Sequence, residues 1–234
     1  MALGIVYPFY EEVIKRREHI LIAGMTGSGK SVFINGMINS ILYKDPSKNR
    51  LVLIDPKRVE LSPYKDMPHT EELATDIPQI ESLLNRCLIA IENRFREMEI
   101  QGLRMYRGPK IYIFIDEMAD LMLTSPRSKK LIQRIAQIGR AANVQLICAT
   151  QCPIVDVIPT QIKVNFGMIV GLHTRSPQDS RNIIGRSGCE ILPKYGRALI
   201  QYADEVDLMN VRIPYVPEEE TQKIIQYRLQ EKRR

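Results

Sequence analysis

Short apolar runs alternate with longer segments of helical periodicity along this chain. Five runs of aliphatic and β-branched residues are predicted to form strands; they span 19–23, 51–54, 111–115, 144–149 and 166–171. Three intervening segments with apolar residues at helical spacing are predicted to form helices; they span 31–42, 77–100 and 128–142. This alternation predicts an α/β fold with a central, mainly parallel sheet flanked by helices.

The C-terminal part of the chain follows a different pattern. Segments 197–202 and 206–213 flank a short polar turn, which predicts a β-hairpin. Two prolines then end the second strand, and segment 214–234 is predicted to contain a helix that begins at Glu218. That helix has acidic residues in its first turn and basic residues in its last, as the helix dipole favours.

The composition excludes several classes of protein. With 234 residues, 44% hydrophobic and 26% charged, the chain is too apolar to be intrinsically disordered and long enough to bury a core. We expect residues 1–234 to form one domain, with 1–18 as an N-terminal extension. No apolar run approaches the roughly 18 residues of a membrane span. The acidic N-terminus is unlike a signal peptide, so we expect a cytoplasmic protein.

Neither the net charge nor the cysteines identify the function of the chain. The net charge is +6, and most of the excess lies in 223–234, where we interpret it as helix-end charge rather than as a DNA-binding tail. The four cysteines have no zinc-site spacing and are expected to be thiols in a reducing compartment, most of them buried; they are Cys87, Cys148, Cys152 and Cys189.

A phosphate-binding motif follows the first predicted strand and opens the next helix. The stretch from Gly24 to Ser31 matches G-x-x-x-x-G-K-[ST] at every fixed position. In such a loop, backbone N–H groups cradle the phosphates, Lys30 reaches the terminal phosphate oxygens and Ser31 offers a hydroxyl to Mg²⁺. The sequence therefore predicts a nucleoside triphosphate site. The residues expected to contact the nucleotide are Gly24, Thr26, Gly27, Ser28, Gly29, Lys30, Ser31 and Val32.

Polar side chains follow two other predicted strands. Asp116 and Glu117 come directly after the strand at 111–115, which suits Asp116 for the metal ion and Glu117 as the general base that polarises a water molecule. Gln151 follows the strand at 144–149, which we expect to lie between the other two. Gln151 could then orient the water and sense the terminal phosphate, so hydrolysis is favoured over simple binding.

Several further motifs together resemble one family. In chain order they are Ile54-Asp-Pro-Lys57, Glu60-Leu61, Met67-Pro-His69, Asp116-Glu-Met-Ala-Asp-Leu-Met122, Gly139-Arg-Ala-Ala142, Ala149-Thr-Gln151 with Pro153, Asp156-Val-Ile158, Ile162-Lys163 with Asn165, and Asp179-Ser-Arg181. Over most of the chain this series resembles the motor domain of the FtsK/SpoIIIE DNA translocases. The resemblance implies a RecA-like P-loop ATPase that uses ATP and Mg²⁺ and works as a homohexameric ring around double-stranded DNA.

The resemblance also implies roles for three arginines. Arg140 matches the position of an arginine finger supplied to the neighbouring subunit, although the residues alone are equally compatible with a charge at a helix end, as for Arg134. Arg181 matches the basic position of a DNA-contacting loop, where the family usually has a second basic residue four positions earlier. This chain has Pro177 there, and we expect Arg175 to compensate. Cys152 also replaces an arginine that is common in the family.

Three functions are compatible with this sequence. The leading hypothesis is a translocase that grips the DNA backbone without sequence preference. The alternatives are a protein-export ATPase like those of type VII secretion and a non-translocating coupling ATPase of plasmid transfer. Relative to larger family members the chain resembles a motor core alone, so any membrane anchor would lie outside it.

Overall fold

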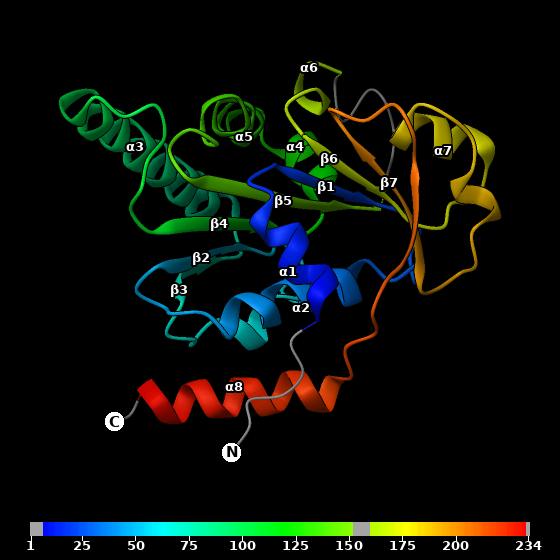
Figure 1. Ribbon diagram of the computed structural model, residues 1–234, viewed down its shortest axis with the longest axis horizontal. Helices are drawn as coiled ribbons and strands as arrows, with labels where there is room; N and C mark the ends of the chain where they lie inside the picture. The colour runs from blue at the N-terminus through cyan, green and yellow to red at the C-terminus, as the bar shows by residue number, and fades with distance from the viewer. Residues whose placement is uncertain (1–6, 152–159, 233–234) are drawn as a thin grey trace.

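The computed structural model describes residues 7–151 and 160–232 (Figure 1). Within these residues eight strands form one sheet in the order β3-β2-β4-β5-β1-β6-β7-β8. The strands are β1 (Ile20–Ala23), β2 (Asn49–Ile54), β3 (Thr70–Ala74), β4 (Lys110–Ile115), β5 (Val144–Thr150), β6 (Met168–Gly171), β7 (Arg197–Tyr202) and β8 (Met209–Arg212). The first six run parallel, and β7 and β8 form an antiparallel hairpin at the edge. The predicted α/β fold with a mainly parallel sheet and a C-terminal hairpin is confirmed.

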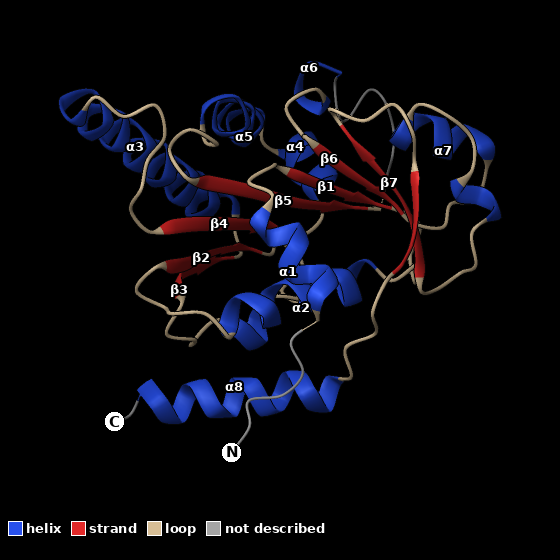
Figure 2. Ribbon diagram, viewed as in Figure 1, coloured by secondary structure: helices blue, strands red, loops and turns tan. Residues whose placement is uncertain are grey.

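Helices cover both faces of this sheet (Figure 2). Besides two short 3₁₀ turns, the described helices are α1 (Pro8–Lys15), α2 (Lys30–Leu42), α3 (Ile77–Gln101), α4 (Met118–Thr124), α5 (Pro126–Ile138), α6 (Thr160–Lys163), α7 (Pro177–Ile184) and α8 (Glu218–Lys232). Figure 2 shows α3, α4 and α5 on one face and α1, α2 and α8 on the other. None of the helices in the described ranges is long and apolar enough to cross a membrane.

The alternation of side chains along each strand feeds two separate cores. In β1, Leu21 packs with the core under α3, α4 and α5, whereas Ile20 and Ile22 pack with the core under α1 and α2. Both faces of the central strands are therefore apolar, as a sheet between two helix layers requires.

Five of the described α-helices and strands were not predicted, namely α1, β3, α4, α6 and α7. The chain before β1 contains α1, whose Tyr10 is fully buried and packs on α2, so this helix of the predicted extension is part of the fold. Strand β3 has a mixed pattern of exposed and buried residues because it lies at the sheet edge, and α4 continues directly from the Asp-Glu pair.

Two elements have a boundary that differs by more than two residues from the predicted one. Helix α5 begins at Pro126 because the Ser125 side chain caps it, and it ends at Ile138, four residues earlier than expected. The chain turns there through Asn143, which has a positive φ of 57°. Strand β8 is also shorter than expected, because the turn of the hairpin extends to residue 208.

The basic C-terminal helix packs against the helix that follows the phosphate-binding motif. Arg228 is buried in α8; its Nε donates to Leu42 O at 2.6 Å and one Nη donates to Lys44 O at 3.1 Å. Thr221 accepts a hydrogen bond from Asn39 of α2. Arg228 thus binds the carbonyls at the C-terminal end of α2 and is not exposed to a nucleic acid.

The cysteines of the described residues are reduced and buried. Burial raises the pKa of Cys87 to about 12 and that of Cys189 to about 11, and it also raises the pKa of Cys148 well above the usual range. These three thiols are therefore unreactive core residues, as expected. Cys152, Pro153 and the Asp156-Val-Ile158 motif lie outside the described residues.

Candidate nucleotide site

The carboxyl ends of three parallel strands, β1, β4 and β5, bring the predicted site residues together at one end of the sheet. Strand β1 leads into the Gly24–Ser31 loop, β4 into Asp116 and Glu117, and β5 into Gln151. As predicted, β5 lies between β4 and β1. Gly24 N donates weakly to Thr150 O at 3.4 Å, and Thr26 Oγ1 donates to Gln151 Oε1 at 2.8 Å. The loop and the end of β5 are therefore in direct contact.

The loop has the backbone that a phosphate cradle needs. Gly27 and Gly29 have φ values of 73° and 102°, a conformation that L side chains rarely adopt. A Cβ at Gly24 would lie 2.7 Å from Leu172 Cβ and from Ser28 Oγ, so only glycine fits there. Helix α2 begins at Lys30, and the exposed N–H groups at its start favour an anion.

Two buried polar groups of the loop are poised for a ligand. Lys30 is 8% exposed, and its Nζ donates to Gly24 O at 2.7 Å and to Met25 O at 3.0 Å. Burial lowers the pKa of Lys30, while the nearby carboxylates of Glu117 and Asp116 oppose that shift. Ser28 Oγ is buried and has no hydrogen-bond partner among the described residues. Such an unsatisfied donor is costly unless something binds it.

The acidic side of the site suits a divalent cation. Asp116 is half-buried, and its pKa is raised to about 6 by burial and by the negative charges of Asp55, Glu60 and Glu117. Ser31 Oγ donates to Glu60 Oε1 at 2.7 Å. Hydroxyl and carboxylate oxygens are ligands that Mg²⁺ prefers, and the crowded carboxylates need a counter-charge. The residues present therefore fit the metal ion that the sequence predicted at Ser31 and Asp116.

Glu117 is held in one orientation at the second position beyond the end of β4. It is 5% exposed, precedes the first residue of α4 and has a φ of 55° and a ψ of 58°. Its Oε1 accepts hydrogen bonds from Thr150 Oγ1 at 3.1 Å and from Gln151 N at 3.0 Å, and its Oε2 accepts one from Lys57 Nζ at 3.2 Å. A left-handed non-glycine residue persists only where its surroundings fix it, and such residues cluster at functional sites.

The sequence reasoning did not assign the loop after β2 to this site. Lys57 and Glu60 belong to motifs that carried the family resemblance, but no role followed from their spacing. The structure brings Lys57 to Glu117 and Glu60 to Ser31, because β2 pairs directly with β4. The sequence signal that could have found Lys57 and Glu60 is their place in a polar segment directly after the apolar run 51–54.

Arg140, which was expected to contact a neighbouring subunit, lies away from the phosphate loop of this chain. Arg140 lies at the amino end of β5, not near the phosphate edge, and its Nη2 donates to Glu18 Oε1 at 2.5 Å. Because β5 has seven residues, this position is about 20 Å from the strand's other end. Arg140 therefore lies at the opposite end of the strands from this chain's own phosphate loop, and its side chain is half-exposed.

Arg181 and Arg175 are both exposed. Arg181 was expected in a loop, but it lies on α7, because Ser176 caps that helix and Pro177 occupies its first turn. The proline that departs from the family pattern is therefore favourable at a helix start. Arg175 precedes this cap and follows β6, so it lies beyond the same edge as the phosphate loop.

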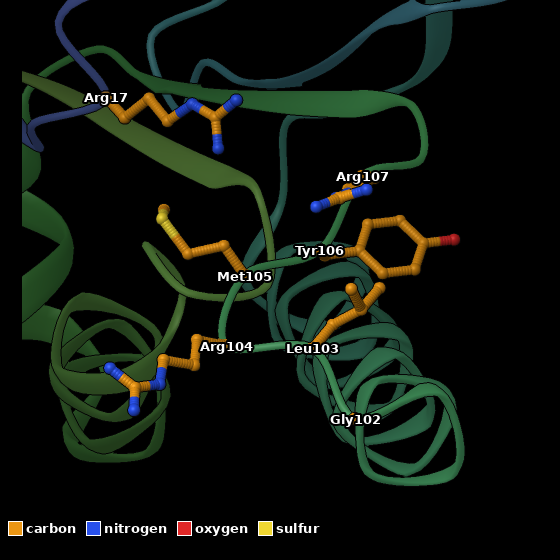
Figure 3. Close-up of a pocket in the computed structure, with 7 residues that line it drawn as sticks. All are labelled: Arg17, Gly102, Leu103, Arg104, Met105, Tyr106 and Arg107. Carbon is orange, nitrogen blue, oxygen red and sulfur yellow. The ribbon is translucent and has the colours of Figure 1, made fainter.

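A separate pocket lies near the amino ends of the strands, at the end of the sheet opposite to the phosphate loop (Figure 3). The segment between α3 and β4 lines it together with Arg17. In Figure 3 Arg17 and Arg107 extend toward the hollow, while Arg104 points away from both. The pocket adjoins the amino end of β4, whereas Glu117 follows the carboxyl end of that strand. We therefore assign the nucleotide site to the carboxyl ends of the strands and not to this pocket.

Comparisons with known proteins agree with this geometry. A model described as the FtsK/SpoIIIE family matches residues 4–110 and 98–155. DNA translocase FtsK 1 of Neisseria meningitidis serogroup B is 34% identical over 249 residues, which cover 92% of this chain and 31% of that protein. DNA translocase FtsK of Helicobacter pylori is 36% identical over 246 residues, which cover 97% of this chain and 29% of that protein. This chain thus spans about a third of the length of these relatives.

Solved structures show the same fold at lower identity. The pCW3 conjugation coupling protein TcpA, determined with ATPγS, superposes with a TM-score of 0.79 at 22% identity, over 92% of this chain and 66% of that one. EssC (ATPases 2 and 3) from Geobacillus thermodenitrificans gives a TM-score of 0.78 at 19% identity, over 92% of this chain and 45% of that one. With the phosphate loop, the Asp-Glu pair and the family match in agreement, this chain belongs to the FtsK/SpoIIIE family.

Proposed function

We propose that this chain is an ATP-hydrolysing motor that moves double-stranded DNA through a homohexameric ring. The relatives that it matches over most of its length are named DNA translocases. The observation that carries the proposal is the fixed carboxylate of Glu117 at the edge that also holds the phosphate loop. A protein that only binds a nucleotide has no need of a carboxylate oriented at that point.

The chain's own residues support hydrolysis as follows. The N–H groups of the phosphate loop and the Lys30 ammonium bind the phosphates, while Gly27 and Gly29 keep the backbone close to them. Ser31 Oγ and the Asp116 carboxylate would hold Mg²⁺, which neutralises charge on the phosphate oxygens when it is bound.

Glu117 would then accept a proton from the attacking water. Its Oε1 is fixed by Thr150 and by the backbone of Gln151, so the carboxylate keeps one direction during the reaction. The Gln151 side chain, next to Thr26, is available to orient the same water molecule.

The ring arrangement is supported by the position of Arg140. It lies at the amino edge of the sheet, about 20 Å from the chain's own phosphate loop, so it could reach a nucleotide only in another subunit. Its side chain is half-exposed, whereas its present partner, Glu18, is partly buried. Solvent screens part of such an ion pair, so the Arg140 guanidinium could leave Glu18 for a phosphate of the neighbouring subunit's nucleotide.

Contact with DNA would come from Arg181 and Arg175. Both are exposed, and neither pairs with a carboxylate among the described residues. Two charges in each subunit suffice when six copies surround one duplex, and binding through the phosphate backbone is independent of sequence.

Displacement of a third strand from linear duplex DNA tests translocation itself. The chain is expected to displace a triplex-forming oligonucleotide in the presence of ATP, and the Glu117→Gln variant is expected not to. Hydrolysis that duplex DNA stimulates without any displacement would contradict the translocase and favour a coupling ATPase. Hydrolysis that ignores DNA altogether would favour a protein-export motor.

A further inference from the structure

One loop contacts both halves of the nucleotide site. The segment after β2, residues 55–61, contributes Lys57 to Glu117 and Glu60 to Ser31. The two distances are 3.2 Å from Lys57 Nζ to Glu117 Oε2 and 2.7 Å from Ser31 Oγ to Glu60 Oε1. The loop thus occupies one polar atom of the proposed general base and one of the phosphate loop.

The base of this loop is rigid. Asp55 is fully buried, and its Oδ2 accepts hydrogen bonds from Glu60 N and Leu61 N, both at 3.0 Å. Arg58 has a φ of 59° and its N–H donates to Asp55 O, which closes a tight turn. Leu61 is fully buried in the core beneath α2. Lys57 and Glu60 are therefore presented to the site from a fixed backbone.

The contact of Lys57 competes with the proposed reaction. Glu117 Oε1 is already occupied by Thr150 and Gln151, so Oε2 is the oxygen left to receive a proton from water. Lys57 donates to that same Oε2. The ammonium takes one of the two lone-pair positions of Oε2 and lowers the basicity of that oxygen, so it opposes proton transfer from a water molecule bound at the other position.

The charges around Lys57 indicate what would draw it away. Its charge interacts with those of Lys30 and Asp116, so it shares the space into which the phosphate loop opens. Its side chain remains 44% exposed, which leaves the long stem free to change rotamer. A terminal phosphate carries more negative charge than a carboxylate and is the stronger partner for an ammonium group.

We propose that Lys57 is a positioning residue that holds Glu117 until the terminal phosphate of a nucleoside triphosphate takes its ammonium group. Occupancy of the site by a triphosphate then frees Oε2 for the water that Glu117 activates. A diphosphate lacks the group that competes for Lys57, so it leaves the pair intact. This inference rests on the proposed function, because it assumes that Glu117 acts as the general base.

A double-mutant cycle measured by binding tests this exchange without any turnover. The dissociation constants of β,γ-imido-ATP and of ADP are measured by calorimetry in EDTA for the wild type, Lys57→Met, Glu117→Gln and the double variant. In both the wild type and the Lys57→Met background, Glu117→Gln removes the repulsion between the carboxylate and the triphosphate. Only where Lys57 is present does it also remove the free-energy cost of breaking the Lys57–Glu117 ion pair. We expect it to tighten triphosphate binding by about three- to tenfold more in the wild type than in the Lys57→Met background.

Three controls separate this role from a structural one. ADP binding is expected to give no such difference, and Lys57→Arg is expected to restore the preference for the triphosphate that Lys57→Met loses. Lys65→Met removes an exposed lysine a few residues further along the chain and is expected to match the wild type in binding and in thermal unfolding.

Equal effects of Glu117→Gln in the two backgrounds would overturn the inference. So would a cycle in which ADP and the triphosphate analogue respond alike. If the coupling is absent while the wild type hydrolyses ATP on DNA, only the role of Lys57 is wrong. If the coupling is present without DNA-dependent hydrolysis, the role of Lys57 stands and the proposed function is wrong.

Discussion

Acidification should destabilise this protein through a histidine that has no part in the chemistry. His19 lies directly before β1, is fully buried, and its Nδ1 accepts a hydrogen bond from Leu146 N at 2.9 Å. Burial, with a smaller contribution from the charge of Arg140, lowers the pKa of His19 from 6.5 to about 4. Between these two values the unfolded chain binds a proton that the folded chain rejects, so stability falls as the pH falls.

The size of this effect follows from the pKa gap. A gap of about 2.5 units corresponds to about 3 kcal/mol in full, and about 2 kcal/mol of it is lost between pH 7 and pH 5. The contribution is fully present above pH 6.5 and is gone below about pH 4.

The contribution of His19 to the free energy of unfolding is measured by urea unfolding of the wild type and of His19→Asn, each at pH 7 and at pH 5. The asparagine carbonyl can accept the hydrogen bond from Leu146 N but does not titrate, so other ionisable groups cancel in the comparison. Between the two pH values the wild type should lose about 2 kcal/mol more than the variant. An equal loss in both proteins would refute the assignment of a depressed pKa to His19.

Three further substitutions test the site and its support. Glu117→Gln should abolish ATP turnover but retain nucleotide binding in a filter assay, and near-normal hydrolysis would disprove its role as general base. Arg140→Ala should be inactive alone but regain some hydrolysis when mixed with Lys30→Ala, and no rescue would contradict a role in the neighbouring subunit. Arg228→Met should destabilise the fold by about 2–3 kcal/mol in urea, because two carbonyls of the α2 terminus lose a buried charged donor. A loss under about 0.5 kcal/mol would contradict that anchoring role.

The sequence predicted those parts of the site that depend on strand ends. The phosphate loop, Asp116 and Gln151 each follow an apolar run, and parallel strands bring their carboxyl ends to one edge. Strand β3 could not be found in this way, because an edge strand with half-exposed residues has no continuous apolar run. Interpreting Arg181 as a loop residue overlooked a local signal, since Ser176 and Pro177 together are typical of a helix start.

The contacts of Lys57 and Glu60 could not be predicted from spacing. Lys57 and Glu117 are 60 positions apart, and their meeting depends on β2 and β4 being neighbours in the sheet. The position of Arg140 depends likewise on where β5 begins, because three residues separate it from that strand and the turn at Asn143 directs the chain. Long-range pairing decides such contacts, whereas local periodicity decides only the elements themselves.

The rate of ATP hydrolysis with and without duplex DNA, at low and at high salt, tests the central claim most directly. The account predicts that duplex DNA of any sequence raises the rate and that the salt increase weakens this stimulation, because the contacts are with phosphates. A hydrolysis rate that duplex DNA leaves unchanged at both salt concentrations would contradict it.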